Sequence, residues 1–180
     1  MEKKVSPSKS ALQYGALFGV LMILEFVIVY VMDVDPITNP TTGIIINTLN
    51  YLVFPVSIIS IGCVNYKKNL NNGFISFGEC LKIGVTICLI AGLIYGVFSA
   101  VFNMIFPEFV EDIMKKTRQV MLQQNPNMTS EQAEMAISMT KKFMNPAIVI
   151  PATVAMFSFM GLIFSLIIGA FVKNENPHSA

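Results

Sequence analysis

Residues Phe77 to Phe106 read FGECLKIGVTICLIAGLIYGVFSAVFNMIF, and no charged side chain follows Lys82 in this stretch. A helix needs about 20 predominantly apolar residues to cross the hydrocarbon core of a bilayer. Lipid offers no partner to backbone N–H and C=O groups, so a spanning stretch of this kind must be helical. Three further stretches have the same length and character: Ala11 to Met32, Gly43 to Val64 and Asn145 to Val172. The sequence therefore predicts an all-α integral membrane protein, a bundle of four transmembrane helices.

The composition of the whole chain agrees with this prediction. Of its 180 residues, 54% are hydrophobic and 13% are charged, and the mean hydropathy is +0.64. Soluble domains of this length rarely have such a composition. The 12 Lys and Arg and the 11 Asp and Glu leave a formal net charge of +1. The chain has no basic arm, so we expect no nucleic-acid partner.

The cysteines and the histidine indicate neither a disulfide framework nor a metal centre. Cys63, Cys80 and Cys88 all lie in or beside apolar stretches, away from the segments expected outside the membrane. The single histidine, His178, lies in a polar tail. No His/Cys cluster has the spacing of a zinc or haem site. We therefore expect no metal centre and no cofactor.

The distribution of lysines predicts the orientation of the chain. Short basic flanks stay in the cytoplasm, and lysines lie before the first stretch and around the start of the third. The first connection, Asp33 to Thr42, carries acids and no base. Both termini are therefore expected in the cytoplasm. No cleavage site follows the first stretch, so we expect it to remain as an uncleaved span. The basic residues are Lys3, Lys4, Lys9, Lys67, Lys68 and Lys82.

The third connection, Pro107 to Met144, is expected to form two amphipathic helices. Apolar residues recur at helical spacing from Glu108 to Gln124. A break follows at Pro126, and Thr129 with Gln132 then has the pattern of a capping box that opens a second helix. Two such helices joined by a short turn predict an extramembrane α-hairpin on the outer membrane surface.

A buried polar layer is the first candidate site, and Glu25 is its central residue. An ionised carboxylate inside a span costs a few kcal/mol, so Glu25 needs a partner, a proton or water. Glu25 and Asn50 each lie seven residues from the outer ends of their stretches, at a depth of about 10 Å. The layer indicates either a proton or ion relay or ligand anchor, or a packing device between helices. We favour packing, since no span offers a basic partner. The layer comprises Glu25, Asn47, Asn50, Ser99, Asn103 and Thr153.

Small residues at a spacing of four indicate close helix packing. Packing within the bundle is the favoured interpretation, and a homodimer face is the alternative. The predicted helix-packing positions are Gly15, Gly19, Gly92, Gly96, Gly161 and Gly169.

Methionines in the third connection suggest a further alternative, a Cu(I) site, because thioethers bind this ion. Their spacing crosses the break at Pro126, so helical phase is not kept. Methionine as adaptable core filler explains the pattern more simply. The candidate copper ligands are Met114, Met121, Met135 and Met139.

The segment Gly73-Phe-Ile-Ser-Phe-Gly-Glu-Cys-Leu-Lys-Ile-Gly84 opens the third stretch, with Ser76 and Glu79 in a predicted capping box. Together with Tyr14-Gly15, the four-span layout and the charged insertion after the third span, it resembles the bacterial membrane family catalogued as domain of unknown function 4199. The resemblance covers nearly the whole chain. It implies an inner-membrane protein of Bacteroidetes-type bacteria without established activity or catalytic residues. Members encoded beside a membrane glycosyltransferase imply an accessory role in envelope assembly.

The predicted function is that of a non-enzymatic scaffold or accessory subunit whose external hairpin meets a membrane-protein partner. The sequence has no nucleophile with a base, no paired carboxylates and no phosphate-binding glycine loop. The alternative is a small transporter or channel component that uses Glu25 with Asn47 and Asn50. An enzyme of lipid or polyprenyl substrates would need Asp-rich or His-rich clusters that the sequence lacks.

Overall fold

The computed structural model describes residues 5–175, and every named element in this range is a helix. Lys3, Lys4 and His178 lie outside the described residues. Four helices are long and apolar enough to cross a membrane: Pro7–Val31, Pro40–Leu70, Phe77–Ile105 and Pro146–Val172. The prediction of an all-α chain with four such helices is confirmed. In chain order the elements are α1 (Pro7–Val31), α2 (Pro40–Thr48), the π-helix η1 (Leu49–Val53), α3 (Phe54–Asn65), the π-helix η2 (Tyr66–Leu70), α4 (Phe77–Ile105), α5 (Pro107–Gln124), α6 (Ser130–Phe143) and α7 (Pro146–Val172).

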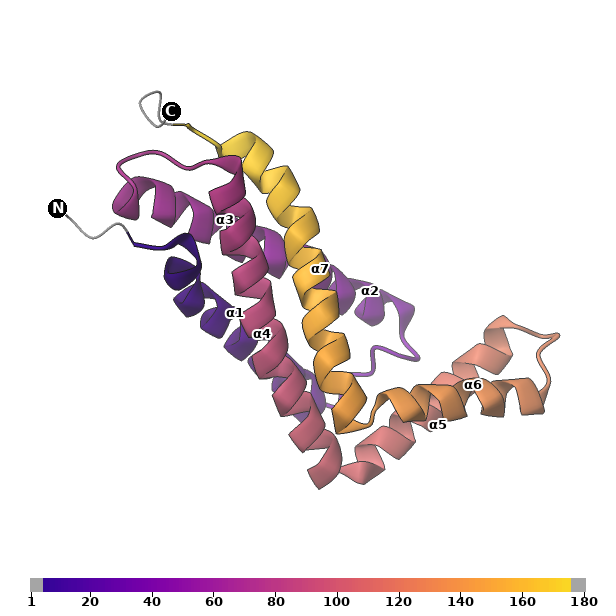
Figure 1. The fold of residues 1–180 in the computed structure, drawn as a ribbon. Helices are drawn as coiled ribbons and strands as arrows, with labels where there is room; N and C mark the ends of the chain where they lie inside the picture. Colours follow the sequence, from indigo (N-terminus) through magenta and orange to yellow (C-terminus); the bar gives the residue numbers. More distant parts are fainter. Residues whose placement is uncertain (1–4, 176–180) are drawn as a thin grey trace.

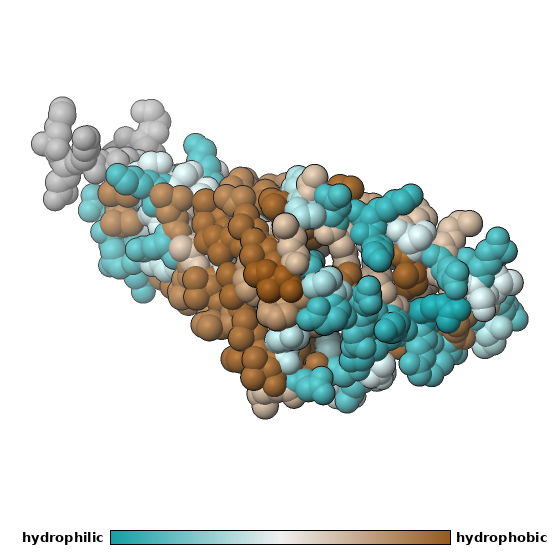
Figure 2. Space-filling view, turned by 90° about the horizontal axis from the view of Figure 1, so that it is seen from below, coloured by the Kyte–Doolittle hydropathy of each residue, from teal (hydrophilic) through white to brown (hydrophobic). Residues whose placement is uncertain are grey.

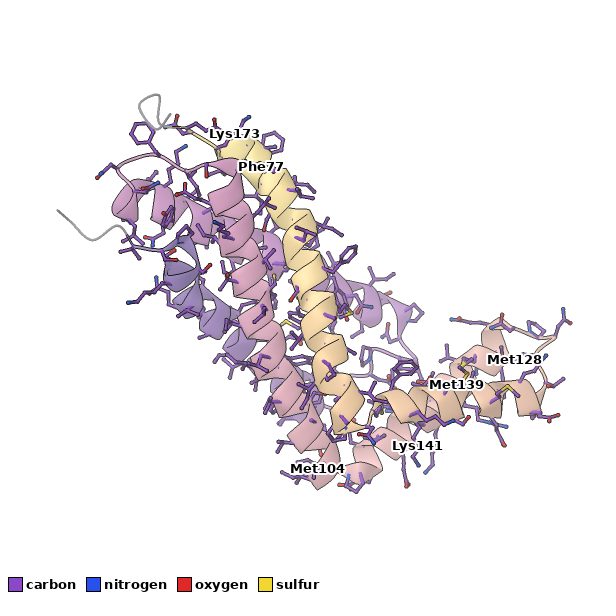
Figure 3. The ribbon with its side chains drawn as sticks, in the orientation of Figure 1. Phe77, Met104, Met128, Met139, Lys141 and Lys173 are labelled. Carbon is purple, nitrogen blue, oxygen red and sulfur yellow. The ribbon has the colours of Figure 1, made fainter. Side chains whose placement is uncertain are left out.

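The helix α4 is the centre of the bundle. It packs along α7 on one side and α1 on the other, while α3 contacts all three (Figure 1). We call the end at which α1 begins and α7 ends the terminal end, and the opposite end the hairpin end. Phe77 and Lys173 lie at the terminal end, and Met104 and Lys141 lie at the hairpin end (Figure 3).

Glycines allow the closest helix contacts in this bundle. All six predicted packing glycines are buried. Gly15 and Gly19 face Ile90 and Ile94 of α4. The remaining four lie where α4 meets α7: Gly92 beside Phe157, Gly96 beside Thr153, Gly161 beside Cys88, and Gly169 beside Phe77. Each of them therefore packs within the bundle.

The second membrane-length helix changes character at η1. Pro55, the second residue of α3, has no N–H to donate to the preceding turn, and the π-helical turn comes immediately before α3. Pro151 lies inside α7, which continues through it. After η1, the helix α3 contacts α4 and α7. Before η1, the helix α2 packs mainly on η1 itself. Figure 1 shows α2 diverging from α4 and α7 toward the hairpin end.

The helices α5 and α6 lie side by side and project from the hairpin end. Both bonds of the predicted capping box between Thr129 and Gln132 are present at the start of α6. Arg118 of α5 pairs with Glu134 of α6 at 3.7 Å. Figure 2 shows apolar residues covering the bundle and hydrophilic residues gathered over the hairpin and the terminal end. This separation indicates a multi-pass membrane protein.

Bonds between distant segments tie the terminal end together. Ile75 and Asn174 form an antiparallel bridge, and Lys67 Nζ donates to the Val172 carbonyl oxygen at 2.9 Å. The predicted capping box of Ser76 and Glu79 is present at the start of α4. The chain before α4 is thereby fixed to the end of α7.

Candidate functional site

Glu25 of α1 and Asn50 of η1 are in direct contact. Asn50 Nδ2 donates to Glu25 Oε2 at 3.3 Å, so the equal depth counted from the sequence corresponds to a real pairing. The two other oxygens, Glu25 Oε1 and Asn50 Oδ1, are buried and accept no hydrogen bond from the described residues. Leaving a buried acceptor unpaired costs about 1–3 kcal/mol. Two such acceptors on one contacting pair therefore need an explanation.

Glu25 and Asn50 line a cavity of about 440 Å³. Its walls come from α1, α2, η1, α4, α5 and the connection between α1 and α2. Five carboxylates and one lysine line it, so its formal charge is strongly negative. Four aromatic side chains also line the cavity: Phe26, Tyr30, Tyr95 and Phe109. The charged residues beyond Glu25 are Asp33, Asp35, Glu108, Asp112 and Lys116.

An ion-pair network closes part of the cavity wall. Lys116 Nζ of α5 lies 3.2 Å from Asp35 Oδ2 and 2.9 Å from Asp112 Oδ2. Asp35 also accepts hydrogen bonds from the Ile37 N–H and from the N–H and hydroxyl of Thr38. Hydrogen bonds to Asp112 and then to Asp35 raise the pKa of Lys116. The network ties the connection between α1 and α2 to α5.

The titration of Asp35 tests this network. Desolvation raises the pKa of Asp35, but hydrogen bonds from Thr38, Ile37 and Lys116 outweigh it and lower the pKa to about 2. The ordinary value is about 4, so the network's contribution is fully present above about pH 4 and is lost as the pH falls through about 2. Thr38→Val should raise this pKa because it removes the hydroxyl bond, while the backbone N–H bonds of residues 37 and 38 remain. Lys116→Gln should raise it as well, because it removes the ion pair. Carboxyl-carbon NMR against pH measures it, and an ordinary pKa in the unmodified protein would contradict the network.

An apolar groove of about 550 Å³ lies between α1 and the second membrane-length helix. Glu25, Val29, Val34 and Ile46 line both this groove and the cavity. Glu25 therefore lies where a charged, aromatic cavity meets a hydrocarbon-lined groove. The remaining groove residues are Leu21, Leu24, Ile28, Thr42, Ile45, Leu49 and Phe54.

The other members of the predicted polar layer lie elsewhere. Asn47 is exposed on α2, and Ser99 is half-buried on α4. Asn103 lines a separate cavity of about 680 Å³ between α4, α5, α6 and the start of α7. Thr153 packs against Gly96. Of the six side chains, the structure brings Glu25 and Asn50 together.

Sequence reasoning missed the aromatic and acidic walls of the cavity. Tyr95 lies one helical turn before Ser99, so helical spacing could have pointed to it. The contribution of α5 had no comparable signal, since nothing local in the sequence places the hairpin against α1.

The sulfur-containing residues lie away from this cavity. Cys63 Sγ of α3 and Cys80 Sγ of α4 are 2.7 Å apart, and both cysteines are free and fully buried, as is Cys88. Of the methionines considered for copper, Met114 is buried and Met121 half-buried on α5, whereas Met135 and Met139 are exposed on α6. The described residues contain no group of three or more His, Cys, Asp or Glu suited to a metal ion. Copper binding by methionine stays a prediction.

Comparison with known proteins gives one match. A family model described as a protein of unknown function, DUF4199, matches residues 13–174. No curated protein and no solved structure matches the chain. The matched range runs from within α1 through all of α7, so the resemblance noted in the sequence is confirmed. The chain belongs to the DUF4199 family of proteins of unknown function.

Proposed function

We propose that the protein is a small transporter or channel component in which Glu25 binds a cation. One observation carries the proposal: Glu25 Oε1 and Asn50 Oδ1 are buried acceptors without a donor among the described residues, on two residues that line the cavity. A packing device would satisfy its own polar atoms. Ionisable residues inside membrane helices commonly belong to ion or substrate pathways.

The proposed location is the bacterial inner (cytoplasmic) membrane, with both termini in the cytoplasm and the α5–α6 hairpin outside. Lys9, Lys67 and Lys68 at the terminal end support this orientation through the positive-inside rule. Asp33 and Asp35 lie at the opposite end, in a connection that contains acids and no bases. The cavity then opens toward the exterior.

Replacing Glu25 with glutamine should abolish cation flux while leaving the fold intact. Glutamine keeps the size and one acceptor of the side chain but removes the charge. The test uses proteoliposomes with a trapped pH indicator and an imposed membrane potential. We expect unmodified protein to carry protons faster than Glu25→Gln protein and protein-free liposomes.

The matched control for this experiment is Glu131→Gln, an exposed acid of α6 away from the cavity. It should carry protons at the unmodified rate. Equal rates for the unmodified protein and Glu25→Gln, with both correctly folded, would exclude proton transport through Glu25.

A second candidate function is that of a non-enzymatic accessory subunit, possessing no chemistry of its own, in envelope assembly. The observation that favours it is an exposed apolar stripe on α6: Met135, Met139 and Phe143 are 63%, 56% and 61% exposed. These residues are spaced by four, so they share one helix face. The partner we propose for this stripe is a helix of another integral membrane protein.

Photocrosslinking from position 139 in intact membranes tests the accessory function. The same membrane protein should be captured from positions 135 and 139 and not from Lys141, an exposed polar residue on the opposite face of α6. A crosslinked dimer of the chain itself would instead indicate a homodimer. Capture of lipid alone would defeat the accessory function.

A further inference from the structure

We propose that the ligand of the cavity is an amphiphile with a protonated amino head group, taken from the outer leaflet of the bilayer. The head group lies in the cavity at Glu25, and the hydrocarbon chain lies in the apolar groove between α1 and the second membrane-length helix. This inference rests on the proposed function, because it names the ligand class of the same site.

The unpaired acceptors of the cavity select the amino head group. An ammonium group has three N–H donors and no acceptor. Glu25 Oε1 and Asn50 Oδ1 are two acceptors that lack donors among the described residues. Both residues line the cavity, so a donor that enters it can reach these atoms after small side-chain rotations. One ammonium group would satisfy both oxygens.

The charge and the rings of the cavity favour the same head group. Four acids besides Glu25 line the cavity, and its one lysine, Lys116, is already paired with Asp35 and Asp112. An anionic head group would be repelled, whereas a cation is attracted. Aromatic faces add cation–π attraction for an ammonium within about 6 Å. Phe26, Tyr30, Tyr95 and Phe109 supply such faces along the wall.

The groove selects a ligand with a hydrocarbon chain. It meets the cavity at Glu25, Val29, Val34 and Ile46. On α1 its lining runs from Leu21 to Val29, about 12 Å at roughly 1.5 Å per residue. One leaflet of a bilayer contributes about 15 Å of hydrocarbon, so the groove holds part of one acyl or alkyl chain and the rest of the chain lies in lipid. A small soluble cation would leave the groove unused.

Binding of three probes to the full chain in phosphatidylcholine nanodiscs tests the inference. The probes are dodecylamine, butylamine with the same head group and a short chain, and dodecanol with the same chain and no charge. We expect saturable binding of one dodecylamine per chain, after subtraction of empty nanodiscs. Butylamine and dodecanol should compete at least about tenfold more weakly, since each lacks one of the two interactions.

Two variants separate the head-group site from the chain site. Glu25→Gln should weaken the binding of dodecylamine by at least about tenfold, the loss expected for a charged hydrogen-bond partner. The binding of dodecanol should not change. Leu24→Trp adds bulk in the groove at an exposed position of α1. This variant should weaken the binding of dodecylamine without changing the binding of butylamine. Glu131→Gln is the control and should bind all three probes as the unmodified protein does.

The outcomes distinguish this inference from the proposed function. If butylamine competes as well as dodecylamine, the ligand of the cavity is a soluble cation. That result would overturn the inference of an amphiphilic ligand and would leave the proposal of cation transport standing. Equal competition by dodecanol would overturn the amino head group. Selective dodecylamine binding with no Glu25-dependent flux would overturn transport and uphold the amphiphile site.

Discussion

Gly161→Ala is expected to lower the thermal midpoint of the protein by several degrees. A Cβ at this position would lie 2.7 Å from Cys88 Cβ and 2.8 Å from the Gly84 carbonyl oxygen. Both contacts are with atoms fixed by the backbone of α4, so α7 has to move away along its length. Overpacking of this kind costs about 1–3 kcal/mol, and each kcal/mol corresponds to about 2–4 °C for a chain of this size.

Gly78→Ala is the matched control for this substitution. A Cβ there would meet no atom within 4 Å, and Gly78 lies in the first turn of α4. Alanine is the better helix former by about 0.5 kcal/mol or more, so this variant should not lose stability. Thermal unfolding followed by circular dichroism in one detergent compares the two. Equal midpoints for Gly161→Ala and Gly78→Ala would mean that α4 and α7 are not in close contact.

Phe102→Ala is expected to destabilise the hairpin end more than any other single truncation of an aromatic side chain. Phe102 is 8% exposed, and its ring centroid lies 4.9 Å from that of Phe26, 5.1 Å from Tyr30 and 5.2 Å from Phe109. It therefore links α4 to α1 and α5. Truncating a buried Phe costs about 3–5 kcal/mol in soluble cores. Lipid is as apolar as the bundle, so the lost contacts and the void remain as the main cost, and we expect roughly 3 kcal/mol.

The same truncation at Phe159 provides the control, because that side chain is 64% exposed on α7. The thermal midpoint of Phe159→Ala should lie close to that of the unmodified protein. Phe102→Ala should also speed trypsin cleavage at Lys115 and Lys116, since Phe109 of α5 loses its ring contact with α4 and keeps those with Phe26 and Tyr30 of α1. Unchanged cleavage and an unchanged midpoint would show that the ring cluster does not hold α5.

The helices and the Glu25–Asn50 pair could be predicted because both follow from length. A span needs a fixed number of apolar residues, and depth depends only on the rise per residue, whatever the rotation of the helix. Counting from the ends therefore placed Glu25 beside Asn50 correctly. The capping boxes at Ser76 and Thr129 were predictable for a similar reason, since their bonds are local.

Helix rotation could not be predicted in the same way. Asn47 was expected in the same polar layer as Asn50, but it lies on α2, which packs mainly on η1 and diverges from α4 and α7. Asn47 is exposed. Spans that are apolar on every side also give no marker of the inward face.

Contacts between distant segments were equally hidden. Asp35 and Lys116 are far apart in the sequence, and each also has a plausible local role, in a turn and in an i,i+4 pair with Asp112. Only the path of the chain between α4 and α5 brings them together. The acidic and aromatic cavity depends on that path.

The bonds at the terminal end give the molecule an uneven stiffness. The bridge between Ile75 and Asn174 and the bond from Lys67 to Val172 fasten η2 and the start of α4 to the end of α7. On the other side of η1, the described residues make no comparable bond between α2 and α4 or α7. Thermal motion should therefore widen the seam between α1 and α2 while the opposite end keeps its shape. Spin labels on α2 should show broad distance distributions to α4, and a pair joining α3 to α7 should show narrow ones.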